Sequence, residues 1–241
     1  MAEPLTEVTP RPVRLAVLAQ WWRRVSFVHW EAAPNAVAHL MPAGVRPDTI
    51  DGVTYVGLVA FRMERTRLFG MPPMPYLGTF EETNVRLYSV DGQGRRGVVF
   101  LSMDASRLAP VVAARAVLGL PYRWSSMRLD ADHGAVTYTC RPVGHRQRSS
   151  LTVEYGEPIK PSPLEVFLTA RWGLHTGRRH LGNEHQPWPL TSANLISCDD
   201  HLIAAAGLPG VADQPPASVL YSPGVHARFG PSRAGSSART R

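Results

Sequence analysis

The chain has 241 residues, of which 44% are hydrophobic, and its formal net charge is +7 at pH 7. This length suits one large domain or two small ones, and the apolar content excludes a chain that is disordered throughout. Two cysteines, Cys140 and Cys198, are too few for a disulfide framework or a zinc cluster.

No stretch approaches the roughly 20 consecutive apolar residues that a membrane span requires. The start of the chain, MAEPLTEVTP, has acidic residues and prolines where a signal peptide has basic and apolar ones. We therefore expect a cytoplasmic protein without a membrane partner.

The positive charge raises the possibility of a nucleic-acid partner. However, the basic residues are scattered along the chain, almost all are arginine, and Lys160 is the only lysine. No recognised nucleic-acid motif occurs. Binding to nucleic acid is therefore less favoured than the two small-molecule hypotheses given below.

The first half of the chain reads mainly as strands. Residues 1–12 have the composition of a flexible arm, and residues 231–241 that of a disordered tail, which leaves 13–230 as a single domain. Bulky and β-branched residues predict strands at 23–30, 52–69, 83–90 and 97–103. Residues 91–94 read as a hairpin turn between the last two strands, and Pro34 opens a short helix that extends to about Leu40.

The second half alternates short helices with strands. The segment 110–118 predicts a helix that Gly119 ends, and Ser162-Pro163-Leu164-Glu165 is a capping box for a helix to about Trp172. Strands are expected at 135–141, 151–155, 192–197 and 218–229, the last interrupted at Pro223-Gly224. Residues 173–190 read as irregular, and Asp199 or Asp200 caps a short helix that ends at Gly207.

About eight strands and four short helices result, without regular alternation of strand and helix. This pattern favours an α+β fold, mainly antiparallel β, with one curved sheet. A sheet of this size often closes on itself and leaves an interior pocket.

Several segments resemble the YqjF-like family of the acetoacetate decarboxylase-like superfamily. They span nearly the whole chain in the family's order, and they are FVHW at 27–30, FEETNVRLY at 80–88, GVVFLSMD at 97–104, LPY at 120–122, HQPWPL at 185–190 and SPGV at 222–225. The resemblance implies an antiparallel β-cone or barrel with a central pocket and a few short peripheral helices.

The resemblance also implies that the lysine of a decarboxylase is missing. The decarboxylase has a Pro-Lys-Lys run after its helix, where this chain has Pro121-Tyr122-Arg123. A Schiff base needs a neutral primary amine, which neither tyrosine nor arginine supplies. In the same comparison, Arg23 matches a pocket arginine and Glu82 matches one of two pocket glutamates, while the second glutamate has no counterpart.

Glu82, Asn84 and Arg86 are spaced by two, so on a strand they project from one face. The pattern alone leaves open whether that face meets solvent or a polar cavity, and the resemblance favours the cavity. There Glu82 would act as a general acid or base, and Arg23, Arg86 or Arg123 would bind a substrate carboxylate.

Three aromatic residues complete the candidate site. Tyr122 is either a hydrogen-bond donor to a carbonyl or enolate oxygen or a core tyrosine bonded to backbone. His29 is either a satisfied core histidine or a pocket acid or base. Trp188 lies between two prolines, which would hold it as a plug or a pocket wall.

Two functional hypotheses follow. The first is a lysine-independent acid–base enzyme of lyase, isomerase or cyclase type that acts on a small organic acid or β-carbonyl compound, including those of secondary metabolism. The second is a non-catalytic protein that binds or senses a small ligand in the same pocket. Neither requires a cofactor or a metal ion, and assembly into a homo-oligomer stays open.

Overall fold

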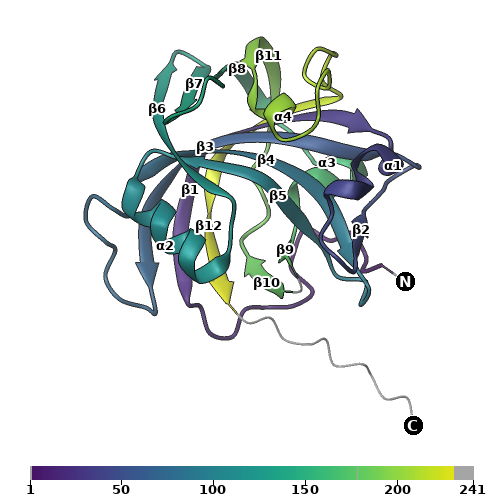
Figure 1. Cartoon of the computed structure of the whole chain (residues 1–241), viewed down its shortest axis with the longest axis horizontal. Helices are drawn as coiled ribbons and strands as arrows, with labels where there is room; N and C mark the ends of the chain where they lie inside the picture. Colours follow the sequence, from purple (N-terminus) through teal and green to yellow (C-terminus); the bar gives the residue numbers. More distant parts are fainter. Residues whose placement is uncertain (1, 178, 231–241) are drawn as a thin grey trace.

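The computed structural model describes residues 2–177 and 179–230 of the chain (Figure 1). Within them lie twelve strands, four α-helices and one 3-10 helix. The strands are β1 (Leu18–Ala32), β2 (Val45–Pro47), β3 (Thr54–Leu68), β4 (Phe80–Asp91), β5 (Arg96–Ala105), β6 (Tyr122–Asp132), β7 (Ala135–Pro142), β8 (Ser149–Pro158), β9 (Gly173–Thr176), β10 (Arg179–Glu184), β11 (Thr191–Asp200) and β12 (Ser218–Gly230). The helices are α1 (Pro34–Val37), η1 (Ala38–Leu40), α2 (Leu108–Leu118), α3 (Pro163–Thr169) and α4 (Leu202–Ala205).

All twelve strands belong to one sheet, and its pairings close on themselves twice. One ring runs β12-β1-β3-β4-β5-β9-β10 and returns to β12. The other leaves β5 through β6, β7, β8 and β11 and also returns to β12. Strands β12, β1, β3, β4 and β5 are therefore a wall that the two rings share.

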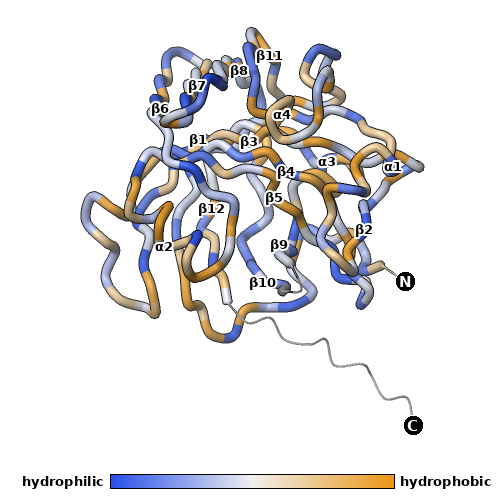
Figure 2. Tube along the Cα trace, in the orientation of Figure 1, coloured by the Kyte–Doolittle hydropathy of each residue, from blue (hydrophilic) through white to orange (hydrophobic). Residues whose placement is uncertain are grey.

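The shared wall separates two hydrophobic cores. The first core packs against α2, α3, β9 and β10, and includes Phe27, Val59 and Phe61. The second core lies between the opposite face of the wall, strands β7 and β8, and α4, and includes Val28, Leu58 and Leu151. In Figure 2 the hydrophobic colour gathers along β3, β4 and β5, as expected for strands that are buried on both faces.

Most of the predicted elements are confirmed. The hairpin turn joins β4 to β5, where the Gly94 amide donates to the Asp91 carbonyl at 2.9 Å. Ser162 and Glu165 form the expected capping box at the start of α3. Gly119 ends α2 with a left-handed φ of 65°, which glycine adopts without strain.

Four expectations about the chain path were wrong. Helix α3 ends at Thr169 rather than near Trp172, because Ala170 leaves helical geometry at φ −86° and ψ 80°. The segment 173–190 contains β9 and β10 instead of being irregular throughout. Strand β6 was not predicted, and its mostly exposed residues give it little hydrophobic signal. The last strand, expected to be interrupted at Pro223-Gly224, is the continuous strand β12.

The segment expected to be a flexible arm lies against the body of the protein. The Trp172 indole donates to the Thr6 carbonyl at 3.1 Å, and the Arg96 guanidinium donates to the Glu3 carbonyl at 2.6 Å. Arg11 is buried and pairs with Glu3. Residues 231–241, expected to be a disordered tail, lie outside the described residues.

Among the residues that the structure describes, no helix has the length and apolar character needed to cross a membrane.

Candidate functional site

Strand β4 directs a row of polar side chains into the first core. Phe80 and Tyr88 belong to that core, and the alternation of the strand places Glu82, Asn84 and Arg86 on the same face between them. The other parity, which includes Val85 and Leu87, faces the second core. The face that the spacing predicted therefore points into the interior and away from solvent.

Glu82 is the centre of one buried polar cluster. Its side chain is 2% exposed; Oε2 accepts a hydrogen bond from the Tyr122 hydroxyl at 2.7 Å, and Oε1 accepts one from Asn84 Nδ2 at 3.3 Å. Tyr122 begins β6, and its register beside Met103 of β5 brings it across from β4. Sequence and structure agree that these three side chains meet.

Burial makes Glu82 an unusual carboxyl group. Desolvation raises its pKa to about 7, although the hydrogen bonds from Tyr122 and Asn84 act in the opposite direction. Burial and the neighbouring Glu82 carboxylate also raise the pKa of Tyr122 well above its usual value. Near neutral pH the phenol therefore keeps its proton, while the carboxyl group can exist in both forms.

A second polar cluster lies further along β4. His29 of β1, Gly57 of β3 and Arg86 of β4 are neighbours across three paired strands. His29 Nε2 is 2.6 Å from the Tyr88 hydroxyl, which also accepts from Arg86 Nε at 3.3 Å. The space at position 57 is tight, since a Cβ there would lie 3.2 Å from both Arg86 Cγ and His29 Cδ2.

The second cluster is positively charged and contains a neutral histidine. Burial, and then the charges of Arg86 and Arg171, lower the pKa of His29 well below its usual value. Arg171 is paired with Asp48 at 2.5 Å. Arg86, in contrast, has no carboxylate within 4 Å among the described residues, and its guanidinium bonds Tyr88 and the Leu168 carbonyl. Arg86 is therefore a cation in the interior without an anionic partner there.

Several buried polar atoms of the described residues lack a hydrogen-bond partner, and those of the two clusters include Asn84 Oδ1, His29 Nδ1 and Arg171 Nη2. A buried polar atom without a partner is unfavourable unless a ligand or a water satisfies it. Each cluster thus presents an unused hydrogen-bonding position.

Aromatic side chains surround the two clusters. Trp188 stacks on Trp22 with ring centroids 5.9 Å apart, and it meets the Phe27 ring edge-on at 5.0 Å. The Trp188 indole donates to the Thr169 carbonyl at 3.0 Å, which fixes its orientation. His185 lies 5.0 Å from Trp188 by ring centroids, and burial lowers its pKa to about 4. Trp188 is therefore part of an aromatic wall, as its flanking prolines suggested.

Arg23, which the family comparison placed in the interior, lies on the opposite face of β1. A β-bulge at Arg24, whose φ is 50°, shifts the pairing with β3 between Arg23 and Ser26. Trp22 and Val25 both reach the first core, so neither arginine between them does. Counting along the sequence could not reveal this extra residue.

Arg123 also lies away from the interior. It follows Tyr122 on β6, so it projects to the other face, where Nε and Nη2 donate to the two carboxylate oxygens of Asp104 at 2.9 and 2.6 Å. Ser125 adds a third hydrogen bond to Asp104 at 2.8 Å. This bidentate pair occupies the donors that a substrate carboxylate would need.

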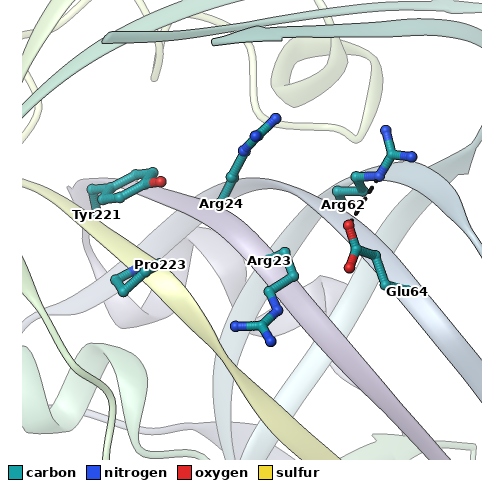
Figure 3. A pocket seen from close by; sticks show the side chains of 6 residues that line it. All are labelled: Arg23, Arg24, Arg62, Glu64, Tyr221 and Pro223. Carbon is teal, nitrogen blue, oxygen red and sulfur yellow. Dashed lines mark ion pairs between the residues drawn. The ribbon is translucent and has the colours of Figure 1, made fainter. Parts of the chain in front are cut away.

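We call the face of the wall that is turned away from the first core the outer face. On this face, a hollow of about 590 Å³ lies beside β1, β3 and β12 (Figure 3). Its lining residues are Arg23, Arg24, Arg62, Glu64, Tyr221 and Pro223. It is distinct from the interior clusters, because Arg62 and Glu64 alternate with Phe61 and Met63 of the first core.

Sequence reasoning missed three residues of the interior. Tyr88 was quoted only as part of a motif, although its spacing of two from Arg86 placed it on the same face. Trp22 stands beside Trp21 near the start of β1, and nothing in its local sequence indicated that it packs against Trp188. Arg171 follows a helix that was expected to continue past it, and nothing in its local sequence indicated burial.

Three histidines, His175, His180 and His185, recur at intervals of five residues in the sequence. His175 and His180 are cross-strand neighbours on β9 and β10, with ring centroids 5.1 Å apart. No group of three or more His, Cys, Asp or Glu side chains arranged to hold a metal ion occurs among the described residues.

Comparisons with known proteins place this geometry in context. The family model DUF2071, described as "Uncharacterized conserved protein", matches residues 19–226. The uncharacterized protein YqjF of Bacillus subtilis (strain 168) is 27% identical over 191 residues, which cover 76% of this chain and 78% of YqjF.

Solved structures share the fold at low sequence identity. Acetoacetate decarboxylase from Legionella pneumophila superposes with a TM-score of 0.64 at 14% identity, covering 97% of this chain and 92% of the other. The enduracididine biosynthesis enzyme MppR, complexed with pyruvate, gives a TM-score of 0.60 at 14% identity, with 90% and 89% covered. An acetoacetate decarboxylase-like enzyme from Sphingomonas wittichii RW1 gives 0.60 at 14% identity, with 96% and 97% covered.

Proposed function

The chain belongs to the DUF2071 family of uncharacterized conserved proteins, which has the acetoacetate decarboxylase-like fold, and from this premise we propose a lysine-independent acid–base enzyme. Its substrate would be a small organic acid or β-carbonyl compound, and the reaction would be of lyase, isomerase or cyclase type. The observation that carries the proposal is the buried Glu82, with a pKa near 7 and a Tyr122 hydroxyl 2.7 Å away.

A carboxyl group with a pKa near the working pH is suited to proton transfer, because it can both accept and return a proton. In the proposed reaction, ionised Glu82 removes a proton from the carbon next to a carbonyl group. The resulting enolate oxygen accepts a hydrogen bond from the Tyr122 hydroxyl, which turns to it from Glu82, or from Asn84 Nδ2. Glu82 then returns the proton to carbon or to a leaving oxygen.

Arg86 supports an acidic substrate. Its guanidinium has no carboxylate within 4 Å among the described residues, so a substrate carboxylate could accept hydrogen bonds from it. Residues 82 and 86 are four apart on one strand, about 13 Å between Cα atoms. The Arg86 guanidinium bonds Tyr88, further along the strand from Glu82, so a small substrate that contacts both groups requires the Arg86 side chain to turn toward Glu82.

The proposal excludes an imine intermediate. Tyr122 stands where the resemblance puts the lysine of a decarboxylase, and a phenol cannot form an imine. The only lysine, Lys160, is exposed in the segment between β8 and α3. Neither residue offers the desolvated primary amine that Schiff-base chemistry needs.

The test follows proton exchange and so does not depend on knowing the natural substrate. Pyruvate, which MppR is described as binding, and acetoacetate are incubated with the protein in D₂O, and loss of the C–H signals is followed by ¹H NMR. Glu82→Gln should lower the exchange rate at least about 100-fold, as expected for loss of a general base.

Glu81→Gln is the matched control. Glu81 is the preceding residue of β4, and its carboxylate is bonded to Arg62 and Ser106 on the outer face. Exchange should be unchanged in this variant. Equal rates in the wild type and Glu82→Gln would refute acid–base catalysis by Glu82.

A non-catalytic binding or sensing role is the second candidate. The unpaired acceptor Asn84 Oδ1 and the unpaired cation Arg86 favour it, because both would bind a ligand without any reaction. Stabilisation of the fold by an organic acid, measured as a rise in Tm and lost in Arg86→Gln, without proton exchange in the wild type, would favour this role.

A further inference from the structure

The outer hollow is shaped by a distortion of β1. On a regular strand, Arg24 would share the face of Trp22 and point into the first core. The bulge instead leaves both Arg23 and Arg24 outside the first core, and both line the hollow, where Figure 3 shows their side chains extending in opposite directions from β1. A strand rarely presents two neighbouring charged side chains to one site, and a bulge is a common means of doing so.

Several contacts hold the bulge in its strained form. Arg24 has a φ of 50°, a left-handed conformation that is uncommon for residues with a side chain. The Tyr138 hydroxyl donates to its carbonyl at 2.5 Å. On β12, Gly224 (φ 128°) lies against the Trp22 carbonyl so closely that a Cβ would clash with it. Strain that is fixed from two sides is characteristic of functional positions.

The charges of the hollow are only partly balanced. Arg62 pairs with Glu64 at 3.2 Å and with Glu81 at 3.1 Å. Arg23 and Arg24 have no carboxylate within 4 Å in the part of the chain that the structure describes. Arg23 is instead positioned by Trp21, with its guanidinium carbon 4.3 Å from the centre of the indole ring. Two guanidinium groups are thus available to an anion.

We propose that this hollow binds a small phosphorylated molecule. Three arginines and one glutamate leave two positive charges in the lining, which match the charge of −1.5 to −2 on a phosphate monoester at about pH 7. A guanidinium group can donate two parallel N–H groups to phosphate oxygens. The hollow of about 590 Å³ has room for an organic group, beside the ring of Tyr221, as well as for a phosphate.

This site is independent of the interior chemistry. Trp22, Val25 and the other inward residues of β1 separate it from Glu82, so either proposal can fail while the other stands. It would let the protein respond to a phosphorylated compound, whether that compound is a regulator or a second substrate.

The experiment titrates the full-length protein with phenyl phosphate by isothermal titration calorimetry at constant ionic strength. Inorganic phosphate and benzoate serve as comparison probes for the phosphoryl group alone and for an aromatic monoanion. We expect saturable binding of phenyl phosphate, weaker binding of inorganic phosphate and the weakest binding of benzoate. The double variant Arg23→Gln/Arg24→Asn should weaken phenyl phosphate binding about tenfold or more. Asparagine is chosen because it tolerates left-handed geometry.

Arg141→Gln is the matched control, since Arg141 is an exposed arginine of β7 outside the hollow. Its binding should equal that of the wild type. The proposal is overturned if phenyl phosphate shows no saturable binding at millimolar concentration, or if Arg141→Gln weakens it as much as the double variant does. Unfolding of the double variant would be detected from its Tm, and the wild-type protein then decides by NMR: the indole signal of Trp21 must shift on titration, and an unshifted signal refutes the site.

Discussion

The two cores share a wall of strands but differ in what they enclose. The second core is mostly hydrophobic, with Trp30 and Tyr221 beside its aliphatic side chains, and the hydroxyl of Tyr138 in it is bonded to Ser26 and to the Arg24 carbonyl. The buried Asp104 carboxylate on this side of the wall is paired with Arg123. The first core encloses a carboxyl group, a guanidinium and an imidazole, and leaves Asn84 Oδ1 and His29 Nδ1 unpaired. The first core thus contains buried polar atoms without partners, an unfavourable arrangement that supports the proposal of a site there.

The largest expected loss of unfolding free energy comes from removing side-chain volume from the second core. Leu151 is 1% exposed on β8, and Leu151→Ala should lower the free energy of unfolding by about 2–5 kcal/mol because it leaves a cavity. Chemical denaturation measures the loss. Leu15→Ala, at a leucine that is 67% exposed, should have little effect. The contrast between the cores would be broken if Glu82→Gln, in the first core, destabilised the protein as much as Leu151→Ala.

The next effect concerns pH. Because burial raises the pKa of Glu82 from 4.5 to about 7, the folded state binds a proton that the unfolded state releases between these values. This contribution to stability is fully present below about pH 4.5 and is lost as the pH rises through 7, a change of about 3 kcal/mol. Glu82→Gln should remove it, so unfolding free energies of wild type and variant should diverge as the pH rises from 4.5 to 8.

Comparing the wild type with Glu82→Gln also cancels the effect of buried histidines on stability, which depends on pH in the opposite direction. Burial lowers the pKa values of His175, His180 and His185 to about 4, 3 and 4, so protonation of these histidines destabilises the fold as the pH falls below about 6.5. Both proteins share this effect, and it cancels in their difference. Parallel stability curves for the wild type and Glu82→Gln would mean that Glu82 has an ordinary pKa.

The smallest effect tests the fit of the second polar cluster. In Gly57→Ala the new methyl group would lie 3.2 Å from Arg86 Cγ and His29 Cδ2, so both side chains must shift. We expect a loss of about 1–2 kcal/mol in unfolding free energy, measured from the change in Tm. Gly92→Ala, where no atom lies within 4 Å of the added Cβ, is the control. Equal Tm values for the two variants would show that the cluster accommodates the added methyl group without loss of stability.

Local signals in the sequence predicted most of the fold. The capping box at Ser162, the stop at Gly119 and the turn at 91–94 depend on neighbouring residues, and all three are present. Strand β6 was missed because its side chains are mostly exposed and show no hydrophobic pattern. The closure of the sheet into two rings depends on the pairings of β10 and of β11 with β12, which no local pattern encodes.

The candidate site was predictable to the extent that it follows strand alternation. The period of two placed Glu82, Asn84 and Arg86 on one face, and the resemblance added Tyr122 as their neighbour. The prediction that Arg23 faces the interior was wrong, because the bulge at Arg24 adds a residue that strand alternation does not anticipate. The roles of these side chains in catalysis or binding remain predictions.

The alternation of β4 limits how its gene can change in length, because odd and even positions of the strand face different cores. A single inserted codon before Glu82 would exchange the two faces, sending Val85 and Leu87 toward the polar clusters and charged side chains into the second core. Two inserted codons would restore both faces at once. Length changes in this strand across related genes should therefore be absent or even in number, while the loops on either side vary freely.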